Sequence, residues 1–291
     1  MTKTTNSEIV KIFDCTKLKK DDIIEIRKCF EDCKIPVIDN FVSNEIINYI
    51  SKNINVDTVP IQCNENGYKE WKPKYKKLGD LSSFMNVLVK KDLEIENQII
   101  NLMKKIEGSV CNFVNNILGY RILHVSRTYR FTKTLKENIH FDNFEPTGPG
   151  IGFLRVFINL DNEERVWNNS LNLYDYLNLE NEKIKLFLKE NNIKATYSGD
   201  NRINDLTMKH FLLSGFNDEM DNVFSDNFPK IQTKFSPGSI WICDSIKSSH
   251  QVIYGNKCIS FNFVIDGETF NSKDNLYFNK MNPILDSLNK L

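Results

Sequence analysis

The chain beyond about residue 120 contains four segments rich in β-branched and aromatic residues, a composition typical of strands. They are RILHVSRTYRF (121–131), GFLRVFINL (152–160), GSIWIC (238–243) and CISFNFVI (258–265). A Pro- and Gly-rich loop joins the first two, and a long polar stretch separates the second from the third. We therefore expect an α+β protein whose core is a mostly antiparallel, jelly-roll-like sheet system.

Helical patterns surround these strand-like segments. Apolar residues recur at helical spacing in KDDIIEIRKCFEDC (20–33), in SNEIINYISKNI (43–54) and along residues 92–117, where Gly108 weakens the pattern. Between the first two, KIPVIDNF (34–41) predicts a short strand. Further helices are predicted in the polar stretch, over residues 179–192 and 203–224.

These patterns predict one domain over residues 1–291, because no repeat or low-complexity linker divides the chain. Residues 1–118 are expected to be a mainly helical support. Residues 119–167 and 231–268 are expected to form the β core, and residues 168–230 a helical insertion between its strands.

Charge and hydropathy limit the classes of partner. Lys+Arg and Asp+Glu both number 38, so a charge-driven nucleic-acid binder is not expected. No apolar run approaches the ~20 residues of a membrane span, and the N-terminus lacks the apolar core of a signal peptide. The seven irregularly spaced cysteines fit reduced thiols. We expect a cytoplasmic protein, with peripheral membrane contact and oligomeric state left open.

A metal site is predicted from the pattern of histidines and aspartate. His140 and Asp142 flank one residue, so on an extended strand their side chains point the same way. His250 follows the turn and strand SPGSIWIC and precedes another strand. Two imidazoles and one carboxylate on one face of a metal are the ligands of non-haem Fe(II) oxygenases. The alternative is that His140 and His250 are surface or hydrogen-bonded core residues.

An oxygenase that uses 2-oxoglutarate also needs a cation for the distal carboxylate of that co-substrate. Arg155 is the leading candidate, because an arginine within GFLRVFINL requires a partner and its planar fork suits a carboxylate. Asn159 shares its strand face, and Asn262 is a polar residue in an apolar strand. Lys257 is the rival anchor, although its place beside a YGN turn favours a solvated lysine.

Other residues and chemistries are weaker candidates. Tyr129, Phe144 and Trp241 are expected at the substrate pocket, with core packing as the alternative for the tyrosine and tryptophan. His124 and His210 are expected to be structural or exposed. No GxSxG, P-loop or GxGxxG motif lies at a strand–helix junction. A halogenase on the same iron fold would lack the carboxylate ligand, so the aspartate of HxD favours hydroxylation.

These motifs resemble those of the Fe(II)/2-oxoglutarate-dependent dioxygenases, whose fold is a double-stranded β-helix. The C-terminal PGSIWIC…SSHQV…ISFNFV is similar to the last ligand strand of cupin-type JmjC hydroxylases. A closer resemblance is to the Kdo hydroxylases, which 3-hydroxylate the Kdo sugar of bacterial lipopolysaccharide. It rests on HFDNF, LRVFINLDNEERVW and FSPGSIWICDSIKSSH. The resemblance implies iron ligation by His140, Asp142 and His250, and co-substrate binding by Arg155.

Three functions follow as hypotheses. The first is hydroxylation of an unactivated C–H bond of a Kdo sugar, on a small molecule or glycolipid, with Fe(II), 2-oxoglutarate and O₂. The second is hydroxylation of a peptide side chain or small natural product on the same iron core. The third is a non-catalytic cupin-like binding protein.

Overall fold

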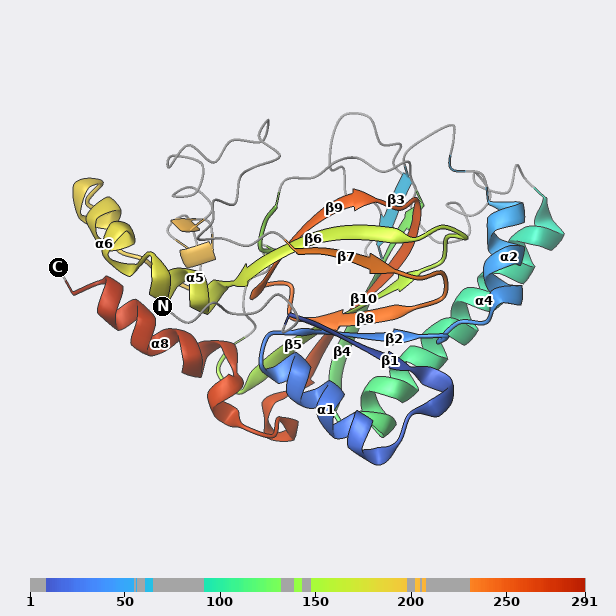
Figure 1. Ribbon diagram of the computed structural model, residues 1–291, viewed down its shortest axis with the longest axis horizontal. Helices are drawn as coiled ribbons and strands as arrows, with labels where there is room; N and C mark the ends of the chain where they lie inside the picture. Colours follow the sequence, from blue (N-terminus) through green and yellow to red (C-terminus); the bar gives the residue numbers. More distant parts are fainter. Residues whose placement is uncertain are drawn as a thin grey trace.

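Two antiparallel-rich sheets face each other in the centre of the molecule (Figure 1). The computed structural model describes residues 9–54, 56, 61–64, 92–131, 139–142, 148–197, 202–204, 206–207 and 231–290, with backbone only for 61–64. The larger sheet has the order β1 (Val10–Asp14), β2 (Ile35–Asp39), β8 (Ile240–Cys243), β5 (Ile151–Asn159), β10 (Lys257–Asp266), β4 (Ile122–Phe131) and β3 (Ile61–Asn64). The smaller sheet has the order β7 (Ile231–Phe235), β6 (Arg165–Asn172) and β9 (Ser248–Tyr254).

Alternation along β5 sorts its side chains between the two faces of the larger sheet. Leu154, Val156 and Ile158 are fully buried on one face. They pack in a cluster with residues of α1 (Lys20–Glu31), α2 (Asn44–Asn53) and α4 (Leu93–Asn112). Arg155 and Phe157 therefore point to the other face, toward the smaller sheet.

The helix α4 follows from its sequence pattern. Asp92 caps its N-terminus by accepting hydrogen bonds from the backbone N–H groups of Glu94 and Ile95. Buried residues then recur every three or four positions on the face turned toward the sheet, at Ile99, Met103, Ile106 and Val110. Gly108 does not interrupt the helix, which continues as a π-helical turn over Phe113–Ile117.

Aromatic side chains fill the space between the two sheets. The ring of Trp241 stacks on Phe235, with 4.0 Å between centroids, and on Phe157, with 5.4 Å. Trp167 of β6 meets Trp241 edge-on at 5.2 Å. These contacts join strands of both sheets, so the sheets are held at a fixed separation beside the site described below.

A third cluster lies at one end of the molecule, left in Figure 1, where α5 (Leu173–Leu179), α6 (Asn181–Glu190) and α8 (Tyr277–Leu288) gather. Short 3₁₀ turns at Cys15–Lys17, Gly267–Thr269 and Lys273–Asn275 complete the described elements. None of the helices in the described part of the chain is long and apolar enough to cross a membrane.

The mixed α/β architecture and its main strands agree with the sequence analysis. The four apolar segments form β4, β5, β8 and β10, and KIPVIDNF contains β2. The N-terminal third is less purely helical than expected, because β1, β2 and β3 extend the larger sheet at both edges. The segment expected to begin the helical insertion at residue 168 instead continues β6 to Asn172. Most of the helix predicted over 203–224 lies outside the described residues.

Candidate metal site

His250 lies on β9, on the face of the smaller sheet that is turned toward the larger one. Its side chain is buried, with 4% of the residue exposed. The ring Nδ1 lies 3.1 Å from the carbonyl oxygen of Ser248. Because a carbonyl only accepts, the ring proton is assigned to Nδ1, and Nε2 keeps its lone pair. The indole of Trp167 stacks on the ring, with centroids 5.0 Å apart.

His140 is tied to His250 through the main chain. The two residues form an isolated antiparallel bridge with reciprocal N–H···O bonds of 3.0 and 2.9 Å. Two residues on, the N–H of Asp142 donates to the carbonyl of Ser245 at 2.8 Å. The bridge and this bond keep the chain extended here, so alternation turns His140 and Asp142 toward His250 and the intervening Phe141 into a separate buried cluster.

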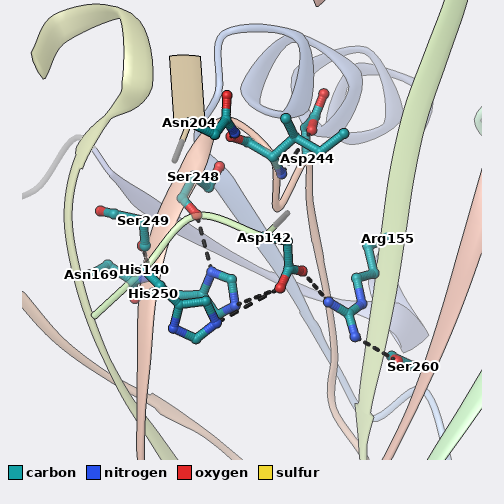
Figure 2. Close-up of polar contacts among 11 residues, drawn as sticks. His140, Asp142, Arg155, Asn169, Asn204, Asp244, Ser248, Ser249, His250 and Ser260 are labelled. Atoms are coloured by element: carbon teal, nitrogen blue, oxygen red, sulfur yellow. Dashed lines mark hydrogen bonds and ion pairs between the residues drawn. The ribbon is translucent and has the colours of Figure 1, made fainter. Parts of the chain in front are cut away.

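The three side chains converge on one point, which Figure 2 shows. Oδ1 of Asp142 lies 3.7 Å from Nε2 of His140 and 3.9 Å from Nε2 of His250. The imidazole centroids are 4.5 Å apart. All three potential ligand atoms lie within 4.8 Å of one another, close enough to hold one metal ion.

Arg155 completes the cluster from the larger sheet (Figure 2). Its Nη1 donates to Oδ2 of Asp142, the oxygen that does not face the imidazoles. Its Nη2 donates to Oγ of Ser260 at 3.2 Å, and its guanidinium lies 4.5 Å from the centroid of Phe157. The arginine predicted to need a partner therefore finds one in a residue of the HxD motif.

The electrostatics suit a divalent cation. Burial raises the pKa of Asp142, but Arg155 and the two histidines outweigh it, and the pKa lies well below its usual range. Burial, helped by the charge of His140, lowers the pKa of His250 to about 4. At neutral pH the site thus offers a carboxylate and a neutral imidazole from these two residues, in the protonation states that bind metal. The donor set is the one that non-haem Fe(II) prefers.

Asn262 also faces the site side of the larger sheet, since it lies directly opposite Arg155 on the neighbouring strand β10. Its Nδ2 lies 3.4 Å from Oγ of Ser126 on β4. Its Oδ1 is buried without a hydrogen-bond partner among the described residues. The structure therefore places this predicted co-substrate residue next to Arg155.

Two other predicted co-substrate residues have structural partners instead. The Nδ2 of Asn159 donates to the carbonyls of Glu163 and Phe235, at 2.8 and 3.0 Å, which ties β5 to β7. The expectation of a solvated Lys257 is wrong. That residue is 7% exposed, and its Nζ lies 3.2 Å from Asp161. It points away from the site because it is an odd number of residues from Asn262 along β10.

The residues expected at the substrate pocket are placed elsewhere or lie outside the described residues. Tyr129 is buried in the cluster between the larger sheet and the helices, because alternation along β4 turns it away from Arg155. Trp241 is fully buried in the aromatic layer between the sheets. Phe144 and His210 lie outside the described residues, and His124 is exposed on β4.

The cysteines whose side chains are described lie outside the metal cluster. None of the six cysteines with described side chains forms a disulfide. Cys243 is fully buried, and burial raises the pKa of its thiol. It is therefore a neutral core residue at neutral pH rather than a nucleophile.

A buried ion pair near the site was not predicted from the sequence. Asp244 and Lys247 lie 2.7 Å apart at the β8–β9 loop, with 2% and 4% of their side chains exposed. The same loop carries Ser245, whose carbonyl holds the backbone of Asp142. The motif DSIK contained the signal, since opposite charges three residues apart can meet across one turn.

Asn169 on β6, the residue directly opposite His250 on β9, was not predicted either. Asn169 is 1% exposed. It is flanked by the polar residues Asn168 and Ser170, so no local sequence pattern distinguished it. Only the strand register reveals that it shares a sheet face with a candidate ligand.

Comparisons of the sequence and of the structure with known proteins point to the same family. The sequence model of the 3-deoxy-D-manno-oct-2-ulosonic acid (Kdo) hydroxylases matches residues 38–286. No curated protein matches the chain significantly. Among solved structures, the apo Kdo hydroxylase KdoO matches with a TM-score of 0.61 and 15% identity, covering 95% of this chain and 96% of that one. KdoO in complex with α-ketoglutarate and Fe(III) matches with a TM-score of 0.60, 15% identity and the same coverage.

Proposed function

The chain belongs to the Kdo hydroxylase family, and on that premise we propose that it is an Fe(II)- and 2-oxoglutarate-dependent dioxygenase that hydroxylates a Kdo sugar. The observation that carries the proposal is the convergence of His140, Asp142 and His250 within 4.8 Å. The solved relative KdoO is a non-heme Fe(II) alphaketoglutarate dependent dioxygenase, and it is similar to this chain along almost its whole length.

The fold proposed to carry this activity is a double-stranded β-helix within one domain over 1–291. Two facing sheets with mostly antiparallel pairing support it, as does the aromatic layer that joins them. Strands from the N-terminal third and from residues 231–266 lie in the same sheet, which argues against separate units.

Each residue of the cluster has a separate task in this proposal. His140 and His250 would hold Fe(II) through Nε2, and Asp142 through Oδ1, so the protein would supply three ligands and the ion could also bind the co-substrate and O₂. Bound there, the iron and 2-oxoglutarate supply the oxidising power for attack on an unactivated C–H bond. Ser248 fixes the tautomer of His250 through Nδ1, and Trp167 and the buried sheet face keep water away from its ring.

Arg155 is proposed to bind a carboxylate of 2-oxoglutarate, with Asn262 beside it. Its positive charge lies at the cluster, whereas Lys257 is paired with Asp161 on the opposite face of the sheet. The guanidinium has five N–H donors, so contacts to Asp142 and Ser260 are compatible with a further acceptor. The substrate proposed to bind beside this cluster is a small molecule or a glycolipid.

Succinate formation and product mass test this function. Protein loaded with Fe(II) and supplied with 2-oxoglutarate and Kdo-lipid A should form succinate and a lipid heavier by one oxygen atom. His250→Ala should abolish both signals. Succinate formation only with a peptide or another small molecule would move the substrate to a different class. If no substrate leads to succinate formation, the non-catalytic cupin-like binding protein is the function that remains.

A further inference from the structure

Asn169 and His250 lie directly opposite each other on the antiparallel strands β6 and β9. Opposed residues of such a pair place their side chains on the same sheet face. Trp167, two residues before Asn169, confirms which face this is, because its indole stacks on the ring of His250 at 5.0 Å. The neighbouring Asn168 therefore points to the other face, where its Nδ2 donates to Gln251 at 2.8 Å.

The amide of Asn169 has a fixed orientation. Its Nδ2 donates to the carbonyl of Ser249 at 3.0 Å. A carbonyl accepts but never donates, so the nitrogen must occupy this position and the oxygen the other. Within the described residues, Oδ1 is buried and has no hydrogen-bond partner. Buried acceptors are nearly always satisfied in native proteins, so this atom can take a donor that the described residues do not supply.

The partner must carry an O–H or N–H group. 2-Oxoglutarate at neutral pH has two carboxylates and a keto group, all of which accept, so it cannot satisfy Oδ1. A polyhydroxylated sugar supplies hydroxyl donors. The same reasoning cannot be applied to Asn262 on the larger sheet. Its amide contacts the hydroxyl of Ser126, which can donate or accept, so this contact does not fix the orientation of the amide.

We propose that Asn169 is a specificity-determining residue whose Oδ1 accepts a hydrogen bond from a hydroxyl of the sugar substrate beside His250. The inference rests on the proposed function and deepens it, since it assigns one wall of the substrate site to β6. The residue acts on the sugar alone: the metal is held by other side chains, and the co-substrate has no donor to offer.

Asn169→Leu tests the proposal, since it keeps the branched four-atom shape of the side chain and replaces both polar atoms, the acceptor Oδ1 included, by methyl groups. Asn168→Leu is the matched control, an adjacent buried asparagine that faces away. Calorimetric titration of Kdo-lipid A into the Co(II)- and 2-oxoglutarate-loaded protein should show affinity weaker by about 10-fold or more for Asn169→Leu. The affinities for Co(II) and 2-oxoglutarate should stay within about 2-fold of wild type in both variants.

Deoxy analogues of the sugar sharpen the result. The analogue that lacks the partner hydroxyl should bind wild type and Asn169→Leu equally, while the others retain the difference. Unchanged sugar affinity in Asn169→Leu would overturn the proposal. So would a loss of Co(II) affinity in that variant alone, because it would assign Oδ1 to a metal-bound water. If Asn169→Leu does not fold, Asn169→Ala, which also removes the acceptor, is measured in the same titrations.

Failure of the proposed function would look different. Wild-type protein would then neither turn over 2-oxoglutarate with Kdo-lipid A nor bind the sugar. The role of Asn169 alone is contradicted if wild-type protein turns over 2-oxoglutarate with Kdo-lipid A and binds the sugar, and Asn169→Leu binds the sugar equally well.

Discussion

Arg155 on β5 donates to Oδ2 of Asp142, while Oδ1 of the same carboxylate faces the two imidazoles. The arginine therefore fixes the rotation of the carboxylate and selects the oxygen that a metal would meet. Partners of this kind commonly tune ligand orientation and metal affinity. The same side chain is also the proposed carboxylate anchor for the co-substrate, so its two roles can be separated by experiment.

Arg155→Gln should weaken Co(II) binding by roughly 10- to 100-fold, because Asp142 loses the partner that orients it. Titration followed by the visible absorption of Co(II) measures this effect. Ser260→Ala, which removes only the contact of Nη2, should change the Co(II) affinity much less. Normal Co(II) binding with lost 2-oxoglutarate binding in Arg155→Gln would restrict the arginine to the co-substrate.

The metal-free protein should become more stable as pH rises from about 4 to about 6.5. The pKa of His250 is lowered to about 4 in the folded state, against about 6.5 unfolded, so the unfolded chain binds more protons in this interval. The expected gain is on the order of 3 kcal/mol in the free energy of unfolding. Urea unfolding across this range measures it.

His250→Gln should flatten that slope, which provides the control for the pH experiment. Asp142 acts at lower pH, because its pKa is held below the ordinary range. Its contribution is present above about pH 4 and is lost on further acidification. An equally steep slope between pH 4 and 6.5 in His250→Gln would assign the effect to other groups.

Lys247→Met should destabilise the fold by about 3–5 kcal/mol, because it leaves the carboxylate of Asp244 buried without its counter-charge. Lys183→Met is the control: its ion pair with Glu180 involves a lysine side chain that is 71% exposed, and about 0–1 kcal/mol is expected. Chemical denaturation of both variants makes the comparison. Equal losses in the free energy of unfolding would show that the buried ion pair of Asp244 and Lys247 stabilises the fold no more than an exposed pair does.

Gly238→Ala and Gly108→Ala should change the stability of the fold in opposite directions. Gly238 has φ of +75° in the turn before β8, and an added Cβ would lie 2.3 Å from the carbonyl oxygen of Val42. Gly108 lies in α4 with nothing within 4 Å of an added Cβ. We expect a loss of more than about 1 kcal/mol for the first and a gain of about 0.5–1 kcal/mol for the second. Thermal unfolding measures both.

Residue chemistry allowed much of the candidate site to be predicted. An HxD pair, a later histidine and an arginine within an apolar strand are unusual in a chain with four histidines. Their side chains need partners when buried, and the structure brings them together. The strongly apolar strands were equally readable, since β5 and β10 are buried on both faces.

What could not be predicted depends on pairing between distant segments. Lys257 appeared solvated because its partner, Asp161, lies 96 residues away in the sequence. The strands β6 and β9 carry many polar residues, so composition did not indicate them. The position of Asn169 beside His250 follows only from the register between those two strands.

The reciprocal main-chain hydrogen bonds between His140 and His250 mean that folding itself, rather than an arriving ion, brings these two imidazoles together. The main chain therefore bears part of the conformational entropy cost of bringing these two ligands together. Small zinc domains differ, because their chains order only when metal binds. Chelation of a bound metal should therefore leave both sheets assembled, because hydrogen bonds of the main chain hold the two histidines side by side.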